Sequence, residues 1–315
     1  MRFICCVLFP LLGSFSSNAQ STSDVGKIAL SVVMPENIEN LDGAQFSKIE
    51  SKITRIITAS GLAATGYNHN FIIYPKFDIY ESEVVEGGLQ NITVVKGELS
   101  LSIMQIDNNL LFSTVTISLK GSGSSRSAAI TNAISQVPPT NPQFEQFIQT
   151  GKSKIINYYE SKCEDIVKKS ESYTKMQKYD QALALLMTVP EEVSGCYAKI
   201  QDKAIDAFKA FKRQQCSELI QRATTTLAGN NYMGTLQILA DIDPSTECFN
   251  EAQRLAVIAE KKANAEAKKE WDFRMEQYHD ALSLEKQRME AIKEIAITYY
   301  KSQPKTIVVN KLIIR

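Results

Sequence analysis

Residues 95–123 read VKGELSLSIMQIDNNLLFSTVTISLKGSG and contain two runs in which apolar and polar side chains alternate. A period of two is typical of strands with one buried face. Asp107, Asn108 and Asn109 separate the two runs and predict a hairpin turn. The polar positions are mostly Ser and Thr, so we expect one face of this sheet to be open to solvent and helices to cover only the other.

The flanking residues extend the hairpin into an α+β domain over residues 20–137. Residues 28–32 alternate and predict a strand, and apolar residues at helical spacing over 46–56 predict a helix after it. Residues 71–79 predict a further strand, in which Pro75 requires an edge or a bulge because proline has no N–H for a ladder. An apolar stripe over 126–137 predicts the last helix. The order is strand, helix, three-stranded meander, helix.

Two glycine-containing segments raise the question of a phosphate site. Gly121-Ser122-Gly123-Ser124-Ser125 stands between a strand and a helix, where phosphate-binding loops are built. The full nucleotide signature is absent, which favours a flexible turn with a Ser helix cap. Gly151-Lys152-Ser153 is similar to the end of a Walker A loop, but Gln146 occupies the position of its first glycine. We expect no cofactor.

This domain resembles a superfamily of bacterial envelope proteins. The resemblance lies in the order of elements, in the strand that leads into Lys120-Gly121-Ser122-Gly123-Ser124-Ser125, and in the helix with Ala128-Ala129. The superfamily includes the curli-secretion channel protein, the outer-membrane activator of penicillin-binding proteins and the N-terminal domain of the Tol translocation protein. It implies a non-enzymatic partner-binding module. Many members are lipoproteins, whereas this sequence lacks the anchor Cys.

Three prolines in residues 138–142 predict a linker, and residues 143–247 then contain one helical unit twice. Each unit has a Tyr, a short apolar helix, a Pro and a Cys followed by an aromatic residue: Tyr179, Pro190 and Cys196-Tyr197 in the first, and Tyr232, Pro244 and Cys248-Phe249 in the second. The units resemble tetratricopeptide-type hairpins with a long period. Neither unit buries its apolar stripe alone, so we expect them to stack.

The spacing of four cysteines predicts two disulfides. A long helix followed by a short return helix brings Cys163 level with Cys196, and the same path brings Cys216 level with Cys248. Cys196 and Cys216 are separated by ~30 Å of one helix, which excludes that pair. In an exported protein this arrangement favours disulfides. Two buried thiol pairs or a four-Cys zinc site are the alternatives, although the ligands lack close CxxC spacing.

The C-terminal part predicts one long helix over 248–302 and a strand over 303–315. Residues 271–299 of this helix carry a coiled-coil-like heptad stripe with one polar break, at Glu285 (Trp271, Met275, Tyr278, Leu282, Met289, Ile292, Ala296, Tyr299). The stripe either joins copies of the chain or packs back on its own chain. Thr306–Ile314 is strongly β-prone and should pair with a sheet edge, either its own or that of a partner.

The N-terminus predicts export. Residues 1–19 read as a signal peptide, with Arg2, an apolar run too short to span a bilayer, and small residues before Gln20. We expect no integral membrane span in the mature chain and a periplasmic, cell-surface or extracellular location. Lys plus Arg (35) balance Asp plus Glu (35), which argues against nucleic acid as a partner.

No residue pattern reaches an enzyme signature. The sequence contains only two histidines, His69 and His279, which are too few to expect a His-based triad or a metal site with several His ligands. Glu81, Glu83 and Glu86 cluster after a strand and are most simply a solvated edge. We therefore expect no catalytic, cofactor or metal residues and a non-enzymatic envelope protein that binds or assembles other envelope proteins. A self-associating subunit and an enzyme with an unrecognised carboxylate site are the alternatives.

Overall fold

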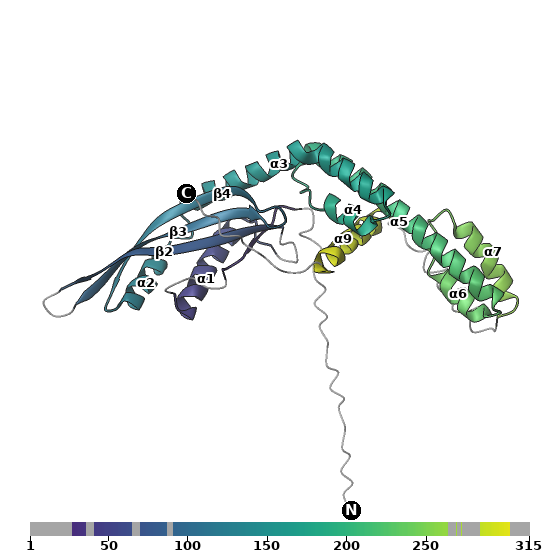
Figure 1. Ribbon diagram of the computed structural model, residues 1–315, viewed down its shortest axis with the longest axis horizontal. Helices are drawn as coiled ribbons and strands as arrows, with labels where there is room; N and C mark the ends of the chain where they lie inside the picture. The colour runs from purple at the N-terminus through teal and green to yellow at the C-terminus, as the bar shows by residue number, and fades with distance from the viewer. Residues whose placement is uncertain are drawn as a thin grey trace, which may run out of the picture.

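The computed structural model of the chain forms an arch with a sheet at one end and helices at the other (Figure 1). It describes residues 27–35, 41–64, 70–86, 91–263, 269, 272 and 284–302, with the side chains of the last helix described from residue 287. Several predictions lie outside these residues: the signal peptide, both histidines, the four heptad residues that precede residue 284 (Trp271, Met275, Tyr278 and Leu282) and the terminal strand over 303–315.

A four-stranded sheet opens the described chain. Its strands are β1 (Leu30–Val32), β2 (Phe71–Val85), β3 (Ile92–Gln105) and β4 (Leu110–Gly123), paired in the order β1-β2-β3-β4. β1 is parallel to β2, and the other pairs are antiparallel. Helix α1 (Gly43–Ala59) follows β1, and α2 (Arg126–Ser135) follows β4. The predicted class and the predicted order of these elements are confirmed.

Pro75 lies where β2 becomes an edge of the sheet. The carbonyl of Ile73 accepts a hydrogen bond from the N–H of Val33 at 3.1 Å, so the backbone of Ile73 faces β1. Pro75 stands two residues later and faces the same side, but β1 pairs with β2 only as far as Ile73. The missing N–H of Pro75 therefore costs no ladder hydrogen bond, as the sequence predicted.

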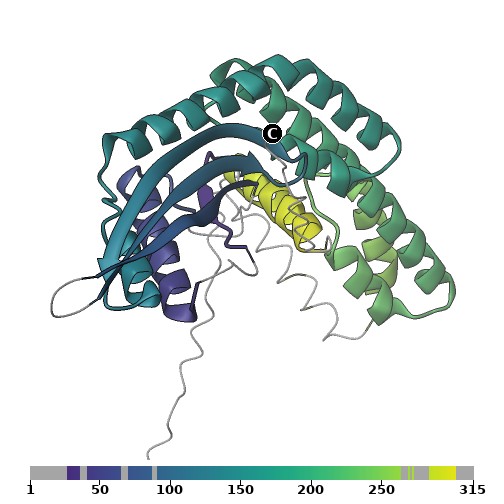
Figure 2. The same ribbon diagram turned by 60° about the vertical axis from the view of Figure 1, so that its left-hand side comes forward.

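The two faces of the sheet differ in chemistry. Helices α1 and α2 cover one face (Figures 1 and 2). On the other, the hydroxyls of Ser100 and Thr116 are 2.8 Å apart and exposed, as are those of Ser102 and Thr114 at 3.4 Å. The open hydroxyl-bearing face confirms the prediction from the alternating pattern.

Gly121 and Gly123 belong to β4 and make room for α2, which corrects the prediction of a flexible turn. A Cβ on Gly121 would collide with the carbonyl oxygen of Ala129 and lie 2.6 Å from the backbone nitrogen of Ala133. The predicted Ser cap is present, because the side chain of Ser125 accepts a hydrogen bond from the N–H of Ala128 at 3.2 Å. The glycines serve close packing of a helix on a strand.

The helical end alternates long and short helices. The long helices are α3 (Pro142–Lys175) and α5 (Ser194–Ala228), and the shorter ones are α4 (Tyr179–Leu186), α6 (Tyr232–Ala240) and α7 (Phe249–Glu260). Gln177 precedes α4 and Asn230 precedes α6, and both have φ of 58°. Two residues at the same place in the proposed repeat thus share a left-handed backbone conformation, which turns the chain sharply at both points.

The hydrophobic core does not divide at the Pro-rich residues 138–142. One cluster of buried side chains runs from the sheet through Phe144 and Phe147 of α3 into α4 and the first half of α5. A second cluster joins the end of α5 to α6 and α7. Gly151 lies where α3 packs against the sheet, because its missing side chain lets the helix approach Ile103 of β3. The sheet and the first helical unit therefore share one core.

The prediction of one helix over 248–302 is wrong. Helix α7 ends at Glu260, and residues 261 and 262 form a turn. A separate helix, α9 (Leu284–Ser302), packs against α4 and α5 and buries Ile292 and Ala296 almost completely. In both views α9 lies between the end of the sheet and the outer helices (Figures 1 and 2). The described part of the heptad stripe is thus covered by the protein's own helices.

Candidate interaction surface

The four predicted cysteines form two disulfides, each between helices that are separated by one short helix in the chain. Cys163 of α3 pairs with Cys196 at the start of α5, with their Cα atoms 5.7 Å apart. Cys216 of α5 pairs with Cys248, the residue before α7, with Cα atoms 6.3 Å apart. These are the two pairs that the sequence predicts. The first bond ties α3 to α5 and the second ties α5 to the start of α7, so both limit changes in the curvature of the arch.

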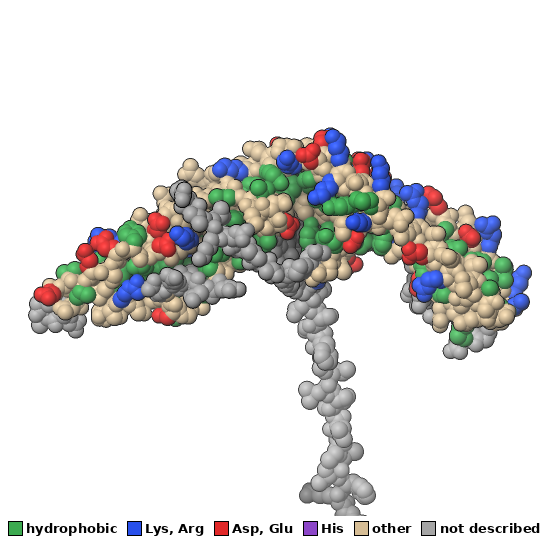
Figure 3. All heavy atoms as spheres, in the orientation of Figure 1, with side chains coloured by type: hydrophobic (Ala, Val, Ile, Leu, Met, Phe, Trp, Pro, Cys, Tyr) green, Lys and Arg blue, Asp and Glu red, His purple; other side chains and the backbone are tan. Residues whose placement is uncertain are grey.

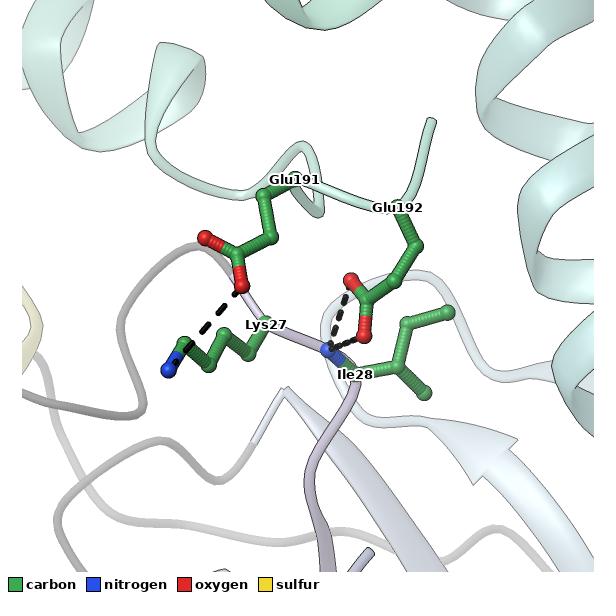
Figure 4. Close-up of polar contacts among 4 residues, drawn as sticks. All are labelled: Lys27, Ile28, Glu191 and Glu192. Carbon is green, nitrogen blue, oxygen red and sulfur yellow. Dashed lines mark hydrogen bonds and ion pairs between the residues drawn. The ribbon is translucent and has the colours of Figure 1, made fainter. Parts of the chain in front are cut away.

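A pair of glutamates in the loop between α4 and α5 holds the start of β1. Both carboxylate oxygens of Glu192 lie 3.3 Å from the backbone nitrogen of Ile28, which donates a hydrogen bond to them (Figure 4). The side chain of Lys27 approaches Glu191 at 3.9 Å. Because Lys27 and Glu191 are both about half exposed, this ion pair contributes less than about 1 kcal/mol. The Glu192 contact is the more specific of the two.

A buried polar cluster joins α3 to the same end of the sheet. The hydroxyl of Tyr159 accepts hydrogen bonds from Asn70 Nδ2 at 3.2 Å and from Gln105 Nε2 at 3.0 Å. Its ring meets that of Phe71 edge-on at 6.2 Å. Burial raises the pKa of Tyr159 to about 12, despite the hydrogen bonds. The protonated hydroxyl is therefore part of the joint between sheet and helices.

At its other end the sheet continues as a hairpin arm, formed by residues 80–85 of β2 and 92–96 of β3, and the tip of this end extends past α2 (Figure 1). Apolar side chains of this arm are exposed: Tyr80 by 64%, Val84 by 63%, Val85 by 50% and Ile92 by 46%. The space-filling view shows hydrophobic side chains among charged ones over this end (Figure 3). Val85 and Ile92 lie opposite each other in the ladder, whereas Val84 points to the other face, so the arm exposes apolar side chains on both of its faces.

Of the acidic residues predicted as a solvated edge, Glu81 and Glu83 lie on this hairpin arm and Glu86 directly follows it. Glu83 and Glu86 are exposed. Glu81 accepts a hydrogen bond from Lys96 at 2.7 Å across the strands, and this contact raises the pKa of Lys96. The ladder shifts register between Ile79 and Glu81, so Tyr80 is bulged. A bulge and charges on an edge oppose random strand pairing.

A hollow of about 350 Å³ lies along the outer edge of β4. It lies between the strand residues 116–120 and the segment that connects α2 to α3 (Gln136, Val137, Pro138, Asn141, Gln143). Lys120 is its single titratable lining residue among the described ones. Within the described ranges, no group of three or more His, Cys, Asp or Glu side chains is placed to hold a metal ion. No described helix combines the length and apolarity needed to cross a membrane.

Comparisons with known proteins do not assign a family. No protein-family model and no curated protein matches the chain. A crystal structure of a minor lipoprotein from Acinetobacter baumannii is similar over 41% of this chain and 87% of that chain, with 12% identity and a TM-score of 0.23. A likeness at this level carries no argument about function. The resemblance to the envelope superfamily and to tetratricopeptide repeats therefore stays a prediction.

Sequence reasoning missed both the hairpin arm and the contact of Glu192 with Ile28. The arm has a signal in the sequence, since Val84, Val85 and Ile92 interrupt an otherwise polar stretch around the β2–β3 turn. The contact with Ile28 has none, because its partners are 164 residues apart.

Proposed function

We propose that this protein is a non-enzymatic interaction or assembly module of the cell envelope and that it works outside the cytoplasm. The two disulfides support an oxidising compartment, because cytosolic thiols are kept reduced. The predicted signal peptide over 1–19 points to the same compartment. N-terminal sequencing of the protein from the periplasmic fraction should begin near Gln20.

The exposed apolar side chains of the hairpin arm carry the interaction role. Tyr80 and Val84 expose more than 60% of their surface, although they stand on a strand whose other half is buried. Leaving such side chains in water forgoes about 1.5–3 kcal/mol each relative to burying them. A partner that covers the arm would recover part of this free energy, so we propose that another envelope protein binds there.

Matched double variants test this role. Val84→Lys with Ile92→Lys places two charges on the arm, whereas Val257→Lys with Ile258→Lys places them on α7, where the residues are 51% and 50% exposed. All four are surface sites, so both variants should keep the wild-type circular dichroism. We expect proteins that co-purify with the mature chain from the envelope fraction to be lost with the arm variant alone. Equal recovery with both variants would contradict the proposal.

Light scattering distinguishes binding of another envelope protein from the alternative, a subunit that associates with itself. If the arm joined two copies of this chain, the mature protein would be a dimer and the arm variant a monomer. Ile292 and Ala296 cannot contribute to self-association through residues 271–299, because α4 and α5 already cover them. The enzyme alternative would require a carboxylate pair, and Glu81 is already engaged by Lys96.

A further inference from the structure

Three apolar residues on the open face of the sheet are buried without belonging to either hydrophobic cluster. Ala29, Ile72 and Met104 are 5%, 2% and 4% exposed, and neither cluster contains them. We call these three residues the end patch. They lie at the end of the sheet that adjoins the helices, where β1 and β2 begin and β3 ends.

The register places the end patch opposite the helices. Phe71 and Ile73 belong to the main core beneath the sheet, so Ile72, which stands between them, points to the other face. Ile72 pairs with Met104 on β3, and Ser31 pairs with Ile72 on β1. Ala29 stands two residues before Ser31 and therefore points to this face too.

The end patch is unlike the rest of its face. Farther along the same strands, the open face carries the exposed hydroxyls of Ser100, Ser102, Thr114 and Thr116. Leu111 pairs with Met104 and is 46% exposed, so it marks the margin of the buried region. An apolar side chain reaches an exposure of a few per cent only when other atoms lie over it. A cover of limited size must therefore lie over this end of the face.

The C-terminal end of α9 lies close to the end patch. The hydroxyl of Tyr300 donates a hydrogen bond to the carbonyl of Ala184 in α4 at 3.0 Å. The loop that follows α4 holds Ile28, the residue before Ala29, through Glu192. Although 38% of Tyr300 is exposed, burial around its hydroxyl raises its pKa, and the charge of Asp107 in the β3–β4 turn adds to the effect. Helix α9 thus ends beside the sheet end that carries the patch.

The chain beyond α9 has the length and the composition of a cover. Residues 303–315 follow Ser302, and at about 3.3 Å per extended residue they reach roughly 40 Å. Of the nine residues from Thr306 to Ile314, six are Val, Ile or Leu. A segment of this kind requires an apolar surface in order to leave water.

We propose that residues 306–314 of the same chain cover the end patch on the open face of the sheet. The segment then lies within its own molecule and is not donated to a partner. This inference does not depend on the function proposed for the hairpin arm, because the two surfaces lie at opposite ends of the sheet.

Oxidation of methionine in the mature, full-length protein tests the cover. Met104 is 4% exposed and Met176 is 52% exposed, so dilute peroxide should oxidise Met104 about tenfold more slowly. Replacing Val308 and Leu312 by Asp should remove most of this protection. Met187, which is 6% exposed in the main core, should stay slow in both proteins and reports that the fold is intact. Fast oxidation of Met104 in the wild type would overturn the proposal.

A photo-crosslink identifies the occupant even if the double Asp variant fails to fold. Benzoylphenylalanine in place of the exposed Leu111 should attach to the tryptic peptides 306–311 or 312–315 in a band of monomer size. The same probe at Val84, on the hairpin arm, should not reach these peptides. Attachment to any other segment would overturn the proposal. Attachment to the two peptides in a dimer band would also overturn it, because the cover would then come from a second copy.

Discussion

The carboxylate of Glu192 accepts a hydrogen bond from the backbone N–H of Ile28, and these two residues are 164 positions apart in the chain. Through this contact the loop after α4 determines where β1 enters the sheet. The sheet and the helices are therefore linked by a specific polar contact in addition to their shared core.

Replacing Glu192 by Ala should lower the free energy of unfolding by about 1–2 kcal/mol, because a half-buried N–H loses a charged acceptor. Glu191→Ala is the matched control and should change it by less than about 0.5 kcal/mol, since Glu191 forms only an exposed ion pair. Urea denaturation of both variants measures the difference. Equal effects would show that the N–H of Ile28 does not need Glu192.

Chemical analysis of the purified protein should detect both disulfides. Peptide mapping without reducing agent should link Cys163 to Cys196 and Cys216 to Cys248 in protein from the periplasm. Replacing Cys163 and Cys196 together by Ala should cost about 2–4 kcal/mol, because the bond closes a loop of 33 residues. Cys163→Ala alone should be worse, since Cys196 is then free to mispair. Four reactive thiols in freshly purified native protein would contradict the pairing.

Gly121→Ala should destabilise the protein by about 2–3 kcal/mol, because the added methyl group would meet the backbone of α2. Gly195→Ala is the matched control near the start of α5, where a Cβ meets nothing within 4 Å. That change should be neutral or should stabilise the helix by up to about 1 kcal/mol. Thermal melting of both variants measures the two changes in stability. A neutral Gly121→Ala would mean that α2 shifts away from β4 without cost.

Alkaline pH should weaken the joint at Tyr159. The pKa of this buried tyrosine is raised from 10.0 to about 12, so between these values only the unfolded chain loses the proton. The stability is therefore fully present below pH 10 and falls by about 2–3 kcal/mol as pH rises to 12. Tyr159→Phe should make the loss of stability between pH 10 and 12 shallower, and an unchanged slope would refute this assignment.

Much of the architecture is determined by local patterns. The alternation over residues 95–119 predicts both strands of the hairpin and the polar open face, since side-chain direction in a strand depends only on position. The spacing of Cys163, Cys196, Cys216 and Cys248 predicts the pairing, because helix rise converts residue number into distance. Pro75 predicts an edge for the same kind of reason, namely a missing donor. Each of these inferences uses the geometry of one element or of a few consecutive elements.

What each apolar surface faces was decided only by the tertiary structure. The heptad stripe requires burial of Ile292 and Ala296, but the pattern is equally satisfied by another copy and by α4. Helix α9 packs on α4, where Ala184 is buried, and the residue at the corresponding place in α6 is the exposed Gln237. Burial free energy depends on area and not on the identity of the covering residues. Periodicity therefore determines that a face is covered, and only the path of the whole chain determines by what.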